Sequence, residues 1–132
     1  MTLSSDDRVE LIRHRITRSH ETRNEAVLLF ENNMYAAAVN RIYYCMFYAL
    51  SALALKDGFS SGKHGQLIGW FNRNYVKTKR VDSRYSKIVT RAFNKRMDSD
   101  YEDFPEFNDN EINEMLVDAD DFVTLIKSIM AE

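Results

Sequence analysis

His64 and Arg96 are the residues of this 132-residue chain best suited to bind an anion. His64 follows Lys63 at the start of a predicted helix, where free amides, an ammonium and an imidazole together favour negative charge. Arg96 closes another predicted helix, shortly before Asp100 and Tyr101. The alternatives are an ordinary polar start for the first helix and, for Arg96, a cation that only stabilises the C-terminal end of its own helix.

Arg41 interrupts the most apolar segment of the chain, beside Tyr43 and Tyr44. A buried cation is costly unless it is paired. One explanation is an acidic partner across a helical bundle, with the two tyrosine hydroxyls at its rim. The other is a cleft in which Arg41 and Tyr44 meet an anionic ligand. The residue types alone leave both open.

The usual motifs of metal and cofactor chemistry are missing from the sequence. It has no glycine-rich phosphate loop, no HExxH and no pair of cysteines, and its three histidines are scattered. We therefore expect neither a metal site nor a cofactor. Cys45 lies in the apolar segment and is expected to be a core thiol.

The net charge of −2 hides a division along the chain. Residues 56–96 carry a net charge of +9, residues 97–132 carry −11, and residues 1–55 are neutral. The basic middle segment could be a face that binds phosphates. It could equally pair with the acidic segment on a neighbouring helix, in which case each pair contributes little to stability.

Length and composition predict one all-α domain spanning residues 1–132. With four glycines and one proline, the chain lacks the turn residues that a β-sandwich or barrel requires. A single cysteine excludes an intramolecular disulfide, and the polar, acidic first residues do not look like a signal peptide. A cytoplasmic location is the expectation that follows.

Apolar residues recur at helical spacing in five segments. The segment over 35–56 is apolar nearly all round, but its uninterrupted run is too short and too rich in tyrosine for a membrane span, so we expect a central buried helix. Asn108 and Glu111 resemble a capping box that opens the last helix, after an acidic loop over 98–108. Short connections then favour an antiparallel up-and-down bundle of four main helices and a short extra one. The remaining helices are predicted over 6–31, 64–75 and 82–97.

The string AVNRIYYCMFYA, from Ala38 to Ala49, resembles the R-x-YY-A-x-F-x-A signature of small prokaryotic HEPN proteins. Lys63-His64 before a helix, the stretch FNRNYVK, and Arg96-x-x-x-Asp100-Tyr101 follow in the family's order, so the resemblance covers about residues 8–130. It implies a HEPN-like helical bundle that forms a homodimer, with polar residues of two protomers facing a shared cleft.

Many HEPN proteins are metal-independent ribonucleases in which four to six residues separate an arginine from a following histidine. By this resemblance Arg96 would hold the scissile phosphate, but no histidine follows it, and Asp100 stands where the acid–base residue is sought. An unperturbed aspartate has a pKa near 3.9, far from what such a role needs. His64 would supply the imidazole if the fold brings it to Arg96, and Tyr101 matches in kind the tyrosine that some antitoxins adenylylate.

Two functional hypotheses follow from the resemblance and the residues together. In the first, the chain is the toxin-like or defence-associated partner of a minimal nucleotidyltransferase and acts on or binds RNA through a cleft around Arg96. If it is an enzyme, it is a metal-independent endoribonuclease. The alternative is a non-catalytic helical dimer that binds a nucleotide or a protein partner. The candidate catalytic residues are Arg96, Asp100 and His64, and the candidate cleft residues are Arg41, Tyr44, Lys63 and Tyr101.

Overall fold

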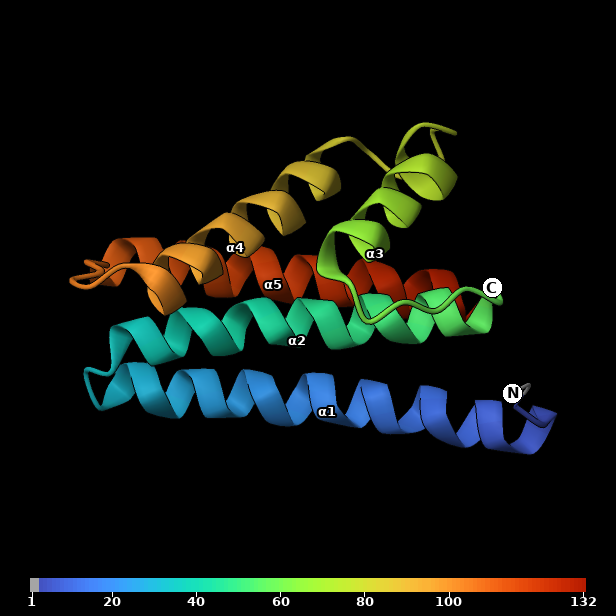
Figure 1. Ribbon diagram of the computed structural model, residues 1–132, viewed down its shortest axis with the longest axis horizontal. Coiled ribbons are helices and arrows are strands. Elements are labelled where there is room, and N and C mark those ends of the chain that lie inside the picture. The colour runs from blue at the N-terminus through green and yellow to red at the C-terminus, as the bar shows by residue number, and fades with distance from the viewer. Residues whose placement is uncertain (1–2) are drawn as a thin grey trace.

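Four long helices run alternately up and down, and two shorter helical segments cover one side of them (Figure 1). The computed structural model describes residues 3–132, and this part of the chain contains no strand. This confirms the all-α, antiparallel bundle. The elements are α1 (Ser5–Glu31), α2 (Tyr35–Lys56), α3 (His64–Phe71), the π-helical turn η1 (Asn72–Val76), α4 (Arg84–Tyr101) and α5 (Asp109–Met130).

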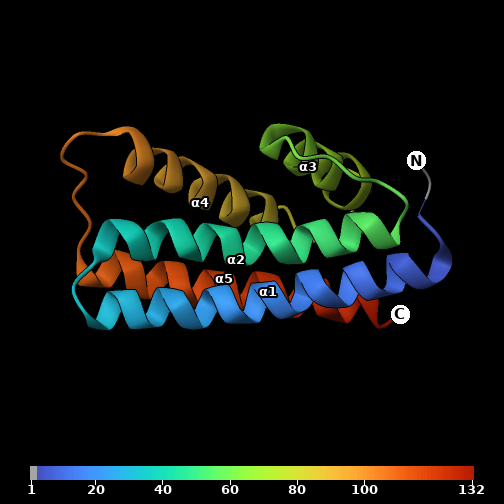
Figure 2. The same ribbon diagram turned by 60° about the horizontal axis from the view of Figure 1, so that its bottom comes forward.

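Helix α2 lies at the centre of the bundle, between α1 and α5 on one side and α3 and α4 on the other (Figure 2). By length and composition it could cross a membrane, but most of its apolar stretch is buried inside the protein. Ala38, Ala49 and Ala52 are fully buried, and such small side chains allow neighbouring helices to approach closely. The predicted central helix is therefore present, and its side chains can reach every other α-helix.

Helix α4 is longer than the sequence pattern predicted. The predicted end near Met97 and the loop from Asp98 are wrong, because the helix continues to Tyr101. Arg96 Nε lies 2.8 Å from Asp100 Oδ2, an i,i+4 ion pair of the kind that stabilises a helical turn. No helix-breaking residue occurs before Pro105. Arg96 and Asp100 consequently share one face of a helix.

The short helix also ends differently from the prediction over 64–75. Its α-helical part stops at Phe71 and a π-helical turn follows, in which Asn74 Nδ2 donates to the Trp70 carbonyl at 2.8 Å. Tyr75, in this turn, is buried, and its hydroxyl donates to Asp57 just beyond α2. Wide turns of this type are rare and tolerated where tertiary contacts offset their poorer geometry.

Some basic side chains of α4 pair with acidic side chains of α5. Four of the eleven cations in residues 56–96 have a carboxylate within 4.0 Å, and three of these four pair with α5. Exposed pairs of this kind contribute about 0–1 kcal/mol each. Pairing with the acidic segment is therefore confirmed for part of the basic segment, and a phosphate-binding face stays a prediction for the rest. The α4–α5 pairs are Lys95–Glu111 at 2.5 Å, Arg84–Asp121 at 3.3 Å and Arg91–Asp118 at 3.8 Å.

Candidate functional site

The Arg96 side chain reaches from α4 to the tyrosine pair on α2. It is only 13% exposed, and its Nη2 donates to the Tyr44 hydroxyl at 2.9 Å. The guanidinium also lies 5.3 Å from the centre of the Tyr44 ring, within cation–π range. With the Asp100 carboxylate 2.8 Å from Nε, the guanidinium is held from two helices. An arginine fixed in this way is preorganised to present its remaining N–H groups to an anion.

His64 approaches the same tyrosine pair from the first turn of α3. Its Nδ1 lies 2.7 Å from the Tyr43 hydroxyl, and its ring centre is 4.3 Å from that of Phe47 and 5.7 Å from that of Tyr44. The Arg96 guanidinium is 5.9 Å from the Tyr43 ring. Residues 64 and 96, on separate helices, are therefore joined through Tyr43 and Tyr44. Within the described residues the Nε2 atom of His64 has no hydrogen-bond partner.

Burial, and secondarily the Arg96 charge, lower the pKa of His64 from its ordinary 6.5. The imidazole is therefore neutral at pH 7, the form that can accept a proton. Burial also raises the pKa of Tyr43 well above its ordinary value, so the phenol keeps its proton. The structure corrects the expectation that the Tyr43 hydroxyl lies at the rim, because Tyr43 is fully buried.

We expect imidazole NMR titration to place the pKa of His64 below 6.5. Arg96→Gln should bring it part of the way back, because burial remains after the charge is removed. Arg84→Gln, which removes the same charge from an exposed position paired with Asp121, should leave it unchanged. Since unfolded His64 binds a proton more readily, its contribution to the free energy of unfolding falls as pH drops through 6.5. A His64 pKa at or above 6.5 would contradict the described environment.

A polar network continues from Asp100 to the outer face of α2. Asn40 Nδ2 donates to Asp100 Oδ1 at 2.9 Å, and Arg41 Nε and Nη2 donate to Asn40 Oδ1 at 3.0 and 2.8 Å. Arg41 pairs with Glu25 of α1 at 3.7 Å and lies 5.0 Å from the Tyr44 ring. Its side chain is 28% exposed. Arg41 thus has an acidic partner across the bundle and lies beside Tyr44, and an anionic ligand at Arg41 stays a prediction.

We name these seven side chains the Arg96–His64 cluster: Asn40, Arg41, Tyr43, Tyr44, His64, Arg96 and Asp100. Sequence reasoning missed Asn40, for which the only signal was an amide inside an apolar helix. Of the predicted residues, Lys63 and Tyr101 stay outside the cluster. Lys63 is exposed before α3, and Tyr101, at the end of α4, is 71% exposed.

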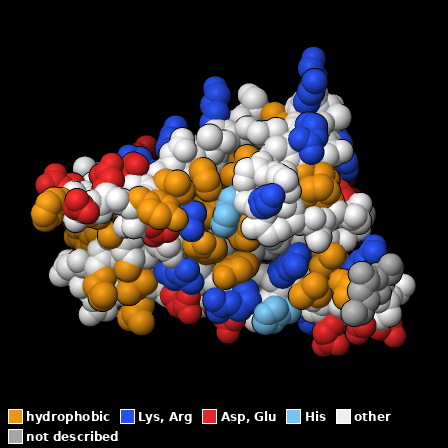
Figure 3. Space-filling view, viewed as in Figure 1, with side chains coloured by type: hydrophobic (Ala, Val, Ile, Leu, Met, Phe, Trp, Pro, Cys, Tyr) orange, Lys and Arg blue, Asp and Glu red, His pale blue; other side chains and the backbone are white. Residues whose placement is uncertain are grey.

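The middle of one face of the protein mixes apolar and basic side chains. In Figure 3, hydrophobic, Lys or Arg, and His side chains lie next to one another there, whereas acidic side chains gather mainly at the left end and along the lower edge. Among residues 3–132, no three His, Cys, Asp or Glu side chains come together as a metal ion would require. The cluster therefore offers two guanidinium groups, a neutral imidazole, the Asp100 carboxylate and aromatic rings.

The sequence of this helical bundle matches a known family. A family model described as the HEPN domain matches residues 12–129. The chain belongs to the HEPN family, which confirms the resemblance derived from the motifs. It is 33% identical over 127 residues to a UPF0332 protein of Thermotoga maritima, with 96% of each chain covered. It is also 33% identical over 131 residues to a Methanocaldococcus jannaschii protein named "Putative toxin", covering 98% of this chain and 96% of the relative.

Proposed function

We propose that this HEPN protein is a toxin-like RNA-cleaving protein whose active site is the Arg96–His64 cluster. The observation that carries the proposal is that Arg96 and His64 meet on one tyrosine pair. The family's usual spacing places a histidine shortly after the arginine. In this chain the imidazole would come from α3 instead, and it would serve as the partner of Arg96 that the motif lacks.

Arg96 would bind the scissile phosphate and stabilise the negative charge that develops on it in the transition state. The neutral His64 would accept the proton of the neighbouring ribose 2′-hydroxyl, whose oxygen then attacks phosphorus. The bond from phosphorus to the 5′-oxygen breaks, and that oxygen takes a proton from solvent as it leaves, while protonated His64 returns its proton to solvent. The products are a 2′,3′-cyclic phosphate and a 5′-hydroxyl, so the reaction requires no metal ion and no oxidant.

Asp100 would act as a positioning residue in this site. One of its carboxylate oxygens accepts the Asn40 hydrogen bond and the other faces Arg96 Nε. Tyr44 would likewise fix the far side of the guanidinium through its hydroxyl. Arg41, beside Tyr44 and less buried than Arg96, would contact a neighbouring phosphate at the rim. Lys63 would add to the positive potential that attracts the strand.

The setting we propose is a cytoplasmic toxin–antitoxin or defence pair with a minimal nucleotidyltransferase as partner. Support comes from the relative named as a toxin and from the exposure of Tyr101, which leaves its hydroxyl accessible to a modifying enzyme. A homodimer would place two Arg96–His64 clusters along one RNA. We therefore expect a basic, aromatic site whose action on RNA stops when a partner protein modifies or covers it.

A second candidate is a non-catalytic module that binds a nucleotide at the same cluster. The observation in its favour is that the Asp100 carboxylate occupies one edge of the Arg96 guanidinium while no histidine lies within six residues after Arg96. Such a module would still bind phosphate through the remaining N–H groups and stack a base on exposed aromatic surface. It would not break the phosphodiester bond.

The test is incubation of the purified protein with tRNA and mRNA in the presence of EDTA. The proposal predicts cleavage with 2′,3′-cyclic phosphate ends, lost in His64→Asn, which keeps a polar side chain but no titratable imidazole. His20→Asn is the matched control, since His20 is exposed on α1 and belongs to another part of the surface. Intact RNA together with bound nucleotide would establish the second candidate instead.

A further inference from the structure

A separate pocket of about 360 Å³ opens between α1, α2 and the loop that leads into α3. Arg15 and Arg18 line it from α1, Tyr48 lines it from α2, and Ser61 and Gly62 line it from the loop. None of its nine lining residues is acidic, although the whole chain has more acidic than basic residues. The pocket therefore concentrates positive charge within a hollow of the surface.

Arg15 is a partly buried cation whose side chain contacts a neutral group. Among residues 3–132 its side chain makes one hydrogen bond, from Nη1 to the Ser51 carbonyl at 3.3 Å. No carboxylate within the described residues lies within 4.0 Å of it. Burial lowers the pKa of Arg15 from its ordinary value, which records the cost of holding this charge away from water. A bound anion would offset that cost.

Arg18 stands next to Arg15 on the same wall and is better solvated. Its guanidinium lies 5.4 Å from the centre of the Tyr48 ring, and it pairs with the exposed Glu21 at 3.4 Å. An exposed pair of this kind is weak and can exchange its carboxylate for a phosphate. The opposite wall is the loop before α3, where the positive end of that helix dipole adds to the field.

An aromatic ridge on α2 connects this pocket to the Arg96–His64 cluster. Phe47 lines the pocket with one side, and its ring centre is 4.3 Å from that of His64. The Tyr48 ring of the pocket is 5.9 Å from the Tyr44 ring that contacts Arg96. A charged pocket followed by aromatic rings and a further cation is an arrangement that suits a single-stranded nucleic acid.

We propose that the pocket lined by Arg15 and Arg18 is a second phosphate subsite, which holds the RNA backbone beyond the phosphate bound at Arg96. This inference rests on the proposed function for the identity of the strand. The subsite itself rests on the unpaired Arg15 and the acid-free pocket, so it can be tested without RNA.

The first experiment titrates inorganic phosphate into the ¹⁵N-labelled full chain. We expect amide shifts concentrated at Ser61 and Gly62, and their loss in Arg15→Gln. Arg23→Gln is the matched control: it removes the same charge from the same helix, where Arg23 makes a two-point contact with Asp120 of α5. Shifts that spread over the basic surface and persist in Arg15→Gln would overturn the subsite.

The second experiment measures binding of a labelled single-stranded RNA as a function of salt. Arg15→Gln and Arg18→Gln should each weaken binding about tenfold and reduce the slope of log K against log salt by about 0.7, the value for one lost phosphate contact on a single strand. Arg23→Gln should match the wild type. If both pocket variants also match it, the subsite is wrong while RNA binding at Arg96 stands. Phosphate shifts without RNA binding would sustain an anion pocket and remove the proposed function.

Discussion

An Arg96→Gln variant is expected to lose RNA cleavage by a factor of about 10²–10³, the usual effect of removing one preorganised donor from a developing negative charge. Arg96 is largely buried and held from two helices, so its guanidinium is fixed in place before a substrate binds. Glutamine keeps a polar side chain of similar reach but loses the charge and the planar fork. The measurement is the single-turnover cleavage rate in EDTA.

Two further variants test whether the loss in Arg96→Gln comes from this particular guanidinium, from how it is positioned, or from the overall charge of the protein. Tyr44→Phe removes only the hydroxyl that accepts from Arg96 Nη2, and we expect a smaller loss of about fivefold, the value of one hydrogen bond. Arg84→Gln removes an exposed charge elsewhere on α4 and should keep the wild-type rate. Equal losses in Arg96→Gln and Arg84→Gln would show a general charge effect and no site. Each rate is compared below the variant's melting midpoint, since Asp100 loses its ion-pair partner in Arg96→Gln.

The largest expected effect on stability comes from Phe122→Ala, at about 3–5 kcal/mol. Phe122 is fully buried on α5, and its ring meets that of Phe71 on α3 edge-on, with centres 5.5 Å apart and planes at 66°. Alanine would leave a cavity where α3 and α5 meet and would remove an aromatic pair that contributes about 0.5–1.5 kcal/mol beyond buried area. Chemical denaturation with urea measures the difference.

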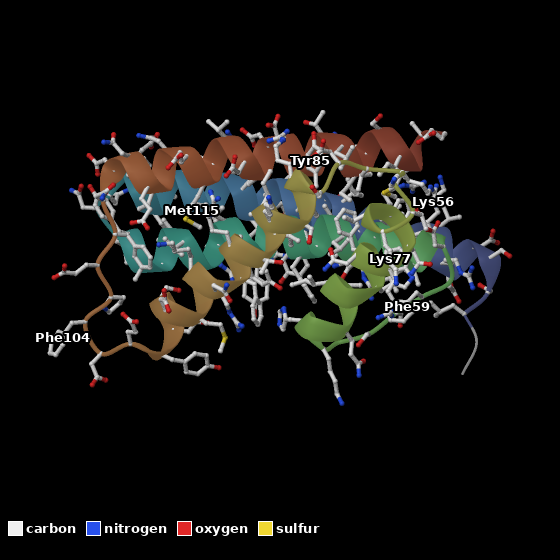
Figure 4. The ribbon with its side chains drawn as sticks, turned by 90° about the horizontal axis from the view of Figure 1, so that it is seen from above. Lys56, Phe59, Lys77, Tyr85, Phe104 and Met115 are labelled. Atoms are coloured by element: carbon white, nitrogen blue, oxygen red, sulfur yellow. The ribbon has the colours of Figure 1, made fainter. Side chains whose placement is uncertain are left out.

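Phe104→Ala is the matched control for this prediction. Phe104 is 89% exposed in the loop before α5 and projects away from the bundle (Figure 4). The same truncation there should change the free energy of unfolding by less than about 0.5 kcal/mol. A comparable loss in both variants would mean that the loop packs against the protein and that the described burial is wrong.

Local sequence patterns were sufficient for the fold class and for most helix positions. The apolar spacing placed five helical segments, and the Asn108 cap was found because its Oδ1 does accept from the Glu111 amide, at 2.8 Å. The other half of that capping box is absent, since the Glu111 carboxylate pairs with Lys95 instead. That choice depends on where α4 crosses α5, which no local pattern encodes.

Helix ends near the site were harder to predict because side-chain pairing decides them. Composition favoured a loop from Asp98, yet the Arg96–Asp100 pair and the Ser99 hydroxyl, which donates to the Arg96 carbonyl at 2.8 Å, accompany one more turn of helix. The prediction therefore assigned Asp100 to a loop, whereas it lies on the Arg96 face of α4. The available signal for the longer helix was the i,i+4 spacing of Arg96 and Asp100. Such a pair contributes only about 0.2–0.5 kcal/mol to a helix, whereas the acidic, aromatic composition of the segment favoured a loop.

The sequence by itself determined the family, the all-α bundle and the buried central helix, because these depend on periodicity and motif order within each segment. Only the tertiary structure brought His64 to Arg96 and left Arg15 unpaired in an acid-free pocket. Both arrangements depend on how α3, α4 and α1 pack around α2. Packing angles follow from the interlocking of side chains on separate helices, and that information is spread over the whole chain.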